Sequence, residues 1–231
     1  METYFELDKV SPCKSSVLTI GNFDGIHRGH QKIINRTVNI AKGKAIPSIV
    51  VTFHPHPKHI LNHDKSKLSI ILDLKNKLKM FDELGVDITL IIDFTDDFSK
   101  INALEFLKNI IVNKFNPDDL VLGYDHHFGH KRTGSPDMVR EFGKNEGINV
   151  EIVNAVSDND SIISSTQIRN HINSGYIRRA NFELGWVYGF NANVVKGAGR
   201  GHSLSYPTAN FVPRDLNQLL PKDGVYLARG R

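Results

Sequence analysis

Short apolar runs alternate with amphipathic segments up to about residue 184, and this alternation restricts the fold more than any other feature of the sequence. Five apolar runs are typical of buried strands: Val17–Ile20, Pro47–Phe53, Ile88–Ile92, Leu120–Leu122 and Asn149–Val153. Three segments between them carry apolar residues on one helical face: His30–Lys42, Leu72–Leu84 and Asn102–Phe115. Strands that alternate with helices in this way predict an α/β fold, with a parallel sheet covered on both faces.

The pattern changes after Leu184. Trp186–Val195 alternates as an antiparallel strand does, three glycines follow at 197, 199 and 201, and helical periodicity stops. We therefore expect two domains, residues 1–184 and residues 185–231. The second is short for a self-sufficient β domain, and its last residues, GVYLARGR, predict a strand cut off within an incomplete sheet.

Composition excludes several classes of protein. The chain of 231 residues is 40% hydrophobic and 23% charged, which is typical of a globular protein with a real core. No apolar run is long enough for a membrane helix, the N-terminus does not resemble a secretory signal, and the single Cys13 cannot form an internal disulfide. We expect a cytoplasmic protein with no membrane partner, and the sequence leaves its oligomeric state open.

The net charge of +4 and the pI of about 9.1 raise the question of nucleic-acid binding. The basic excess lies after residue 164 and is diffuse, without a stripe of Lys and Arg interleaved with aromatic residues. We therefore expect no nucleic-acid partner.

The segment GNFDGIHRGH, residues 21–30, follows the first expected strand and opens the first expected helix. Ligands of open parallel sheets bind at the carboxyl ends of the strands, and a helix N-terminus there offers free N–H groups to a phosphate. His27 and His30 can both face one ligand across this turn and stabilise charge on a phosphoryl group. Asn22 and Asp24 could equally contact a ligand or hydrogen-bond within the turn.

A second candidate phosphate site is SSTQIR, residues 164–169. Ser164, Ser165 and Thr166 precede a helix expected to begin near Gln167, and Arg169 lies one turn further along. A guanidinium at that position can hold a polyphosphate tail. Taken alone, the same pattern is also explained by hydroxyl groups that cap the N-terminus of a surface helix.

The chain resembles the Rossmann-like H-x-G-H nucleotidyltransferases and, more closely, the adenylyltransferase half of bacterial bifunctional riboflavin kinase/FMN adenylyltransferases (FAD synthetases). Four motifs carry the resemblance in the same order along residues 17 to about 184: GNFDGIHRGH, VTFHPHP at 51–57, GYDHHFG at 123–129 and ISSTQIR at 163–169. One departure is His126, where many members of the family have an aromatic residue.

The resemblance implies that FMN attacks the α-phosphorus of ATP and releases pyrophosphate. It assigns catalysis to His27, His30 and Arg169. It implies ATP contacts for seven residues: Gly21, Asn22, Phe23, Gly29, Ser164, Ser165 and Thr166. It implies FMN contacts for six: His54, Pro55, Pro57, Asp125, Phe128 and Arg132. Mg²⁺ is expected to arrive with ATP.

Residues 185–231 are similar to the beginning of the family's riboflavin kinase domain, an antiparallel β-barrel. GAGRGHSLSYPTAN, residues 197–210, matches its glycine-rich turn, and the resemblance places Mg-nucleotide on Thr208 and Asn210. The family's kinase base lies on later strands, so we expect no riboflavin phosphorylation by this chain, although a full-length parent would also act on riboflavin.

Two alternatives remain. The first is another H-x-G-H nucleotidyltransferase, against which GYDHHFG and PTAN argue. The second is a histidine-rich protein that binds metal or nucleic acid, suggested by 11 histidines and the high pI. The cluster HPHPKHILNH, residues 54–63, lacks the helical H-x-x-x-H spacing of zinc sites and has no cysteine nearby.

Overall fold

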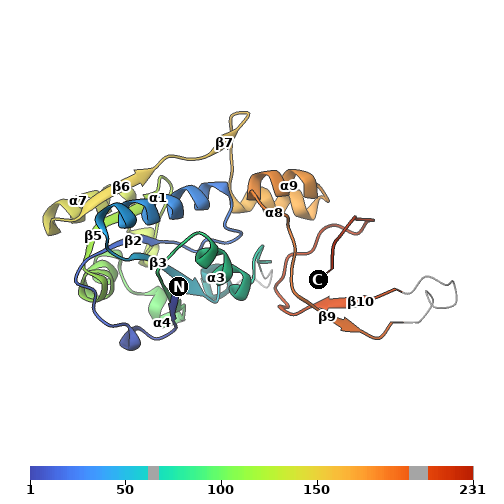
Figure 1. Ribbon diagram of the computed structural model, residues 1–231, viewed down its shortest axis with the longest axis horizontal. Coiled ribbons are helices and arrows are strands. Elements are labelled where there is room, and N and C mark those ends of the chain that lie inside the picture. The colour runs from blue at the N-terminus through green and yellow to red at the C-terminus, as the bar shows by residue number, and fades with distance from the viewer. Residues whose placement is uncertain (62–67, 198–207, 231) are drawn as a thin grey trace.

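The computed structural model describes residues 1–61, 68–197 and 208–230. Six strands form one parallel sheet in the order β1-β4-β3-β2-β5-β6 (Figure 1). They are β1 (Glu2–Tyr4), β2 (Ser16–Ile20), β3 (Ser48–His54), β4 (Ile88–Asp93), β5 (Pro117–Gly123) and β6 (Asn149–Val153). The predicted parallel α/β fold is confirmed, and β1 adds an edge strand that the sequence pattern did not predict.

Helices cover both faces of the sheet, as expected. On one face α1 (Arg28–Lys44) and α3 (Leu74–Glu83) pack Ile34, Val38 and Phe81 against β3. On the other face the sheet packs against a continuous helical segment and α7 (Pro136–Glu146). That segment is α5 (Ala103–Phe106), a π-helical stretch (Leu107–Val112) and α6 (Asn113–Phe115). The predicted helix over 102–115 is therefore present, with a wider turn in its middle.

The remaining elements are short. Between the strands of the sheet lie a 3₁₀ turn at Leu7–Lys9, α2 (Pro57–Leu61), α4 (Asp96–Ser99) and a 3₁₀ turn at His130–Arg132. After β6 come the antiparallel pair β7 (Ser157–Asp158) and β8 (Ser161–Ile162), then α8 (Ser165–Asn173) and α9 (Ile177–Leu184).

The chain beyond α9 departs from the predicted strands. Among the described residues of this part, β9 (Ala192–Val195) and β10 (Asn210–Pro213) form an antiparallel pair, and Figure 1 shows them projecting from the α/β body. Residues 186–191 do not join the expected strand, because Trp186 and Tyr188 pack on the buried cluster beside α8 and α9 instead. GVYLARGR forms no strand over residues 224–230, and Val225 and Leu227 are fully exposed. An extended segment needs a neighbouring backbone to become a strand, and no described residue pairs with this one.

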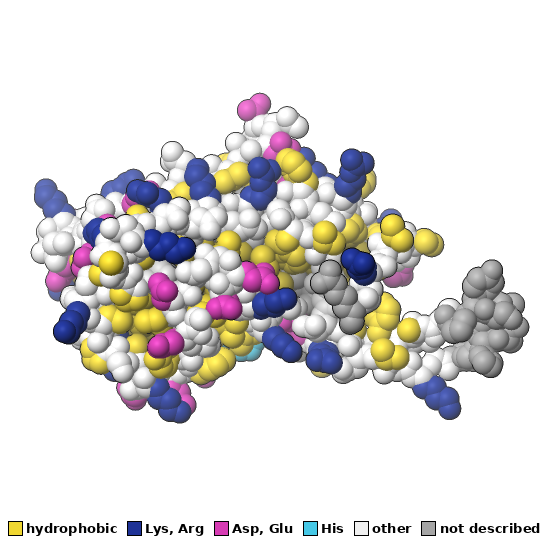
Figure 2. Space-filling model, in the orientation of Figure 1, with side chains coloured by type: hydrophobic (Ala, Val, Ile, Leu, Met, Phe, Trp, Pro, Cys, Tyr) yellow, Lys and Arg dark blue, Asp and Glu magenta, His cyan; other side chains and the backbone are white. Residues whose placement is uncertain are grey.

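Helix length and surface charge complete the description of the fold. Across the described residues, no helix is both long enough and apolar enough to span a bilayer. Figure 2 shows Lys and Arg interspersed with Asp and Glu over the α/β body, and very little histidine on that face.

Candidate active site

A cavity of about 240 Å³ opens at the carboxyl ends of β2, β3 and β5, at the edge where ligands of parallel sheets bind. Eight of the predicted site residues line it: Gly21, Asn22, Phe23, His30, Asp125, Ser165, Thr166 and Arg169. Asp24, which the sequence left open between ligand contact and turn formation, also lines it, as do five residues that were not assigned to the site: Ile33, His56, Lys58, Gly123 and His126. Segments from all four motifs that carry the family resemblance therefore meet at this cavity.

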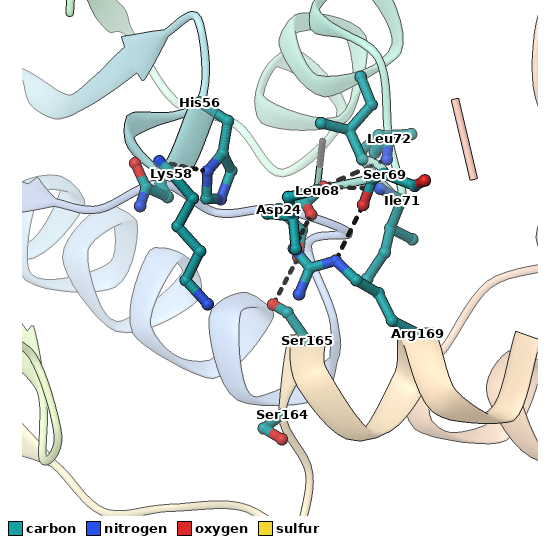
Figure 3. Close-up of polar contacts among 12 residues, drawn as sticks. Asp24, His56, Lys58, Leu68, Ser69, Ile71, Leu72, Ser164, Ser165 and Arg169 are labelled. Atoms are coloured by element: carbon teal, nitrogen blue, oxygen red, sulfur yellow. Dashed lines mark hydrogen bonds and ion pairs between the residues drawn. The ribbon is translucent and has the colours of Figure 1, made fainter. Parts of the chain in front are cut away.

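The other predicted residues of this site lie outside the cavity lining: His27, Gly29, His54, Pro55, Pro57, Phe128, Arg132 and Ser164. Ser164 points away from Asp24 in Figure 3 and caps α8, where its hydroxyl accepts a hydrogen bond from the Gln167 N–H at 3.3 Å. Helix α8 thus begins at Ser165, two residues earlier than expected.

The loop before α1 places His27 and His30 against each other. Their rings stack with centroids 3.7 Å apart, and Phe23 meets His30 edge-on. His27 is the N-cap of α1, where its Nδ1 accepts a hydrogen bond from the His30 N–H at 3.4 Å. A neutral imidazole that accepts at Nδ1 carries its proton on Nε2, so His27 has an N–H donor on its other edge.

Burial holds both rings in the neutral form. It lowers the pKa of His27 to about 4, with Asp24 opposing the shift and Arg169 adding to it. Burial also lowers the pKa of His30 well below its usual value, helped by the positive charges of His27 and Lys77 when they are protonated. Among the described residues, His30 Nδ1 is a buried atom without a hydrogen-bond partner. The pair is suited to donate hydrogen bonds to a ligand rather than to carry charge.

Asp24 is the centre of a buried network rather than of a local turn (Figure 3). Its carboxylate accepts hydrogen bonds from the Ile71 N–H at 3.0 Å and the Leu72 N–H at 3.3 Å, and it pairs with Arg169 Nη2. The Ser165 hydroxyl donates to the Asp24 carbonyl at 2.9 Å. The network joins the glycine loop to the first turn of α8.

Arg169 is 8% exposed and is held from two sides. Asp24 binds its Nη2, and the Ser69 carbonyl accepts from its Nε at 3.0 Å. In the part of the chain that the structure describes, Nη1 has no such partner. A fixed guanidinium that still lines the cavity can offer this edge to a phosphate.

Lys77 is a buried lysine beneath the loop, and sequence reasoning missed it. Its side chain is on α3, it is 7% exposed, and its Nζ donates to the Asn22 carbonyl at 2.8 Å. Burial lowers its pKa, and Asp24 opposes that shift. The Thr52 hydroxyl donates to the same carbonyl at 3.3 Å. Asn22 makes no turn contact through its side chain, since its Oδ1 is buried and unpartnered in the described residues.

The predicted flavin side contributes two histidines to the cavity. His126 stacks on the buried Phe128 ring with centroids 5.3 Å apart, and burial lowers its pKa to about 4. His56 accepts a hydrogen bond from the Lys58 N–H, and burial lowers its pKa to about 3, with Arg169 and Lys77 adding to the shift. His56 belongs to the VTFHPHP motif, so that motif is the signal that could have found it.

The predicted kinase metal site is described only in part. Thr208 is exposed, and the exposed Asn210 opens β10 beside the backbone of Gly197. Residues 198–207, which hold most of the glycine-rich turn, lie outside the described residues. Elsewhere, among residues 1–61, 68–197 and 208–230, no three His, Cys, Asp or Glu side chains gather as a metal site.

Comparison with known proteins decides the family. The FAD synthetase model matches residues 10–167, more than half of the chain. The chain belongs to this family. The riboflavin kinase model matches residues 184–231.

Curated relatives agree with this assignment. Bifunctional riboflavin kinase/FMN adenylyltransferases from Buchnera aphidicola (Schizaphis graminum strain) and Listeria monocytogenes are 35% and 34% identical to this chain. The matches cover 93% and 94% of the chain and 68% of each relative. A crystal structure described as a macrolide-efflux protein from Streptococcus pneumoniae is also similar, with a TM-score of 0.86 and 30% identity over 97% of this chain and 72% of that one.

Proposed function

We propose that this chain transfers the adenylyl group of ATP to FMN, giving FAD and pyrophosphate. One observation carries the proposal: the four motifs of an FAD synthetase converge on one cavity with neutral histidines, a fixed arginine and a helix N-terminus around it. An oxygen of the FMN phosphate forms a bond to the α-phosphorus, and the bond from that phosphorus to the oxygen bridging to the β-phosphate breaks. Such a transfer needs positioning and charge stabilisation, not a protein nucleophile.

Each group has a role that fits its geometry. His27 Nε2–H and His30 donate to the oxygens of the α-phosphate as negative charge moves during transfer. The free edge of Arg169, with Ser165 and Thr166 at the start of α8, faces the departing pyrophosphate. Gly21, Asn22, Phe23 and Gly29 are proposed ATP contacts of the loop.

The flavin phosphate is proposed to approach from the Asp125 and His126 side of the cavity. Phe128 backs His126, while His54, Pro55, Pro57 and Arg132 are proposed to meet the flavin outside the cavity itself. Mg²⁺ is proposed to enter bound to ATP, where it would neutralise phosphate charge. Asp24 and Asp125 are the carboxylates at the cavity, and Asp24 is already held by Arg169 and two backbone N–H groups.

Further proposals follow from the family. We propose that the enzyme works in the cytoplasm, where ATP is available, with ATP, FMN and riboflavin as its small-molecule partners and no nucleic acid. We also propose that residues 1–184 form the adenylyltransferase unit and residues 185–231 part of the riboflavin kinase unit, with Thr208 and Asn210 toward Mg-nucleotide.

A turnover assay tests the proposed function. The purified chain is incubated with Mg²⁺, ATP and either FMN or riboflavin, and FAD, FMN and pyrophosphate are measured separately. FAD and pyrophosphate should form in equal amounts from FMN. A folded sample that binds ATP and produces no FAD from FMN would overturn the proposal. Preference for CTP or another acceptor phosphate would favour a different H-x-G-H transferase.

His27→Ala tests the chemistry of the loop. If His27 donates to the transferring phosphate as proposed, its removal should lower kcat by about 10²–10³-fold while FMN binding is kept. His127→Ala is the control, since His127 is exposed and outside the cavity lining. A His27→Ala enzyme with near-normal kcat would remove His27 from this role.

A further inference from the structure

Gln218 and Leu219 belong to the part of the chain that matches riboflavin kinase, yet both are buried against the adenylyltransferase unit. Leu219 is 2% exposed and packs with Ile71 and Ile168 in one hydrophobic cluster. Gln218 is 7% exposed, an unusual burial for a polar side chain. A buried carboxamide is retained in a core only where its hydrogen bonds are made.

Those hydrogen bonds hold the segment Ser69–Leu72. The backbone pairs Gln218 with Ile70: the Ile70 N–H donates to the Asn217 carbonyl and the Leu219 N–H to the Ile70 carbonyl, both at 2.8 Å. Gln218 Nε2 shares its two N–H groups among four acceptors: the Ile70 and Ile71 carbonyls at 3.3 Å, the Leu219 carbonyl at 3.2 Å and the Tyr188 hydroxyl at 3.1 Å. The Tyr188 hydroxyl donates to the Leu219 carbonyl, which leaves its oxygen to accept from Gln218.

The other edge of the same segment holds the catalytic network (Figure 3). The N–H groups of Ile71 and Leu72 donate to the Asp24 carboxylate, and the Ser69 carbonyl accepts from Arg169 Nε. Ser69–Leu72 therefore lies between Gln218 on one side and the Asp24–Arg169 pair on the other. A shift of this segment would move two of the groups that fix the Arg169 guanidinium.

We infer that Gln218 is a positioning residue for adenylyl transfer: its side chain fixes Ser69–Leu72, and that segment fixes the Asp24–Arg169 pair at the ATP phosphates. This inference rests on the proposed function. Gln218 lies in the kinase-matching part of the chain, yet it would help to hold the adenylyltransferase site in place. It would act on ATP binding rather than on FMN binding.

Gln218→Met tests the inference, because methionine keeps the length and burial of the side chain and removes the amide donor. We expect the dissociation constant and KM for ATP to rise about fivefold to tenfold, with the KM for FMN changed less than twofold. Tyr226→Phe is the control, because the Tyr226 hydroxyl lies in the same kinase-matching part of the chain but donates to the Lys222 carbonyl, outside the network. Calorimetric titration with ATP gives the affinity without requiring turnover.

A double-mutant cycle separates positioning from a general loss of stability. On an Asp24→Asn background the network is already broken, so Gln218→Met should add less than twofold to the ATP dissociation constant. Equal ATP affinity for Gln218→Met and Tyr226→Phe, or full additivity with Asp24→Asn, would overturn the inference. If Gln218→Met does not fold, Tyr188→Phe must raise the ATP dissociation constant at least twofold. An unchanged ATP affinity of Tyr188→Phe overturns the inference. A wild-type chain that binds ATP but makes no FAD counts against the proposed function alone.

Discussion

Lys77 shows how a residue outside every motif can belong to the site. Its ammonium donates a hydrogen bond to the Asn22 carbonyl, so a buried charge holds the loop that carries the histidines. A charge-assisted hydrogen bond is worth about 1.5–3 kcal/mol, which corresponds to roughly tenfold or more in rate. We expect Lys77→Met to lower kcat/KM for FAD formation by about tenfold.

Lys75 provides a matched control for this prediction, since it is an exposed lysine on the same helix. Lys75→Met should leave kcat/KM unchanged. Lys77→Met should also raise the pKa of His30, because the positive charge of Lys77 helps to lower it. Equal kinetics for the two variants, together with an unmoved His30 in a proton NMR titration, would contradict the role of Lys77.

Individual residues also mark where sequence reasoning stops. His30 and Arg169 could be singled out because motifs mark them, and both line the cavity. Lys77 could not be singled out, because in the sequence it is one more polar position of an amphipathic helix. Its burial depends on the loop at Asn22 that packs over it. Asp24 could be noticed in the turn, but its partners Ile71 and Leu72 are far along the chain and carry no polar side chain.

At the scale of elements, α1 carries two glycines in different surroundings. A Cβ on Gly29 would lie 3.1 Å from the His27 ring, whereas one on Gly43 would have nothing within 4 Å. Gly29→Ala should displace the His27 ring and weaken the N-cap, and we expect turnover to fall about tenfold. Gly43→Ala should keep turnover and raise the thermal midpoint slightly, because alanine favours a helix interior. Steady-state kinetics and thermal unfolding measure both, and a Gly29→Ala enzyme as active as Gly43→Ala would contradict the packing argument.

Hydrophobic periodicity predicted the helices and strands that bury an apolar face. It failed where a strand forms only because another strand pairs with it. β1 has only three residues and no apolar run, so it becomes a strand through pairing with β4. The reverse holds for Trp186, whose indole N–H donates to the Gly25 carbonyl and keeps the chain there out of a sheet. α7 was overlooked although Ser135, Pro136 and Gly147 mark its ends in the usual way.

In the molecule as a whole, the buried histidines of the site make the free energy of unfolding depend on pH. The pKa of His27 and of His126 is about 4 in the folded chain, and that of His56 about 3, against 6.5 as the ordinary value. Below pH 6.5 the unfolded chain therefore binds more protons than the folded chain, and the free energy of unfolding must fall as the pH falls. The stabilisation from keeping these histidines neutral is complete above pH 6.5 and is lost as the pH falls, down to about pH 4 for His27 and His126 and about pH 3 for His56.

Thermal unfolding measured from pH 7.5 to pH 4.5 tests this linkage, and we expect the midpoint to fall by at least about 5 °C. His126→Phe should make the fall shallower, because phenylalanine can keep the stacking on Phe128 and removes a group that protonates only on unfolding. His127→Phe is the comparison variant, because His127 is exposed and affects the pKa of His126 only through its charge, which adds to the lowering by burial; its effect on the fall should be smaller. If both variants keep the wild-type dependence on pH, burial of His126 does not contribute to the acid sensitivity of the fold, and the neutral state assigned to it at the cavity loses its support.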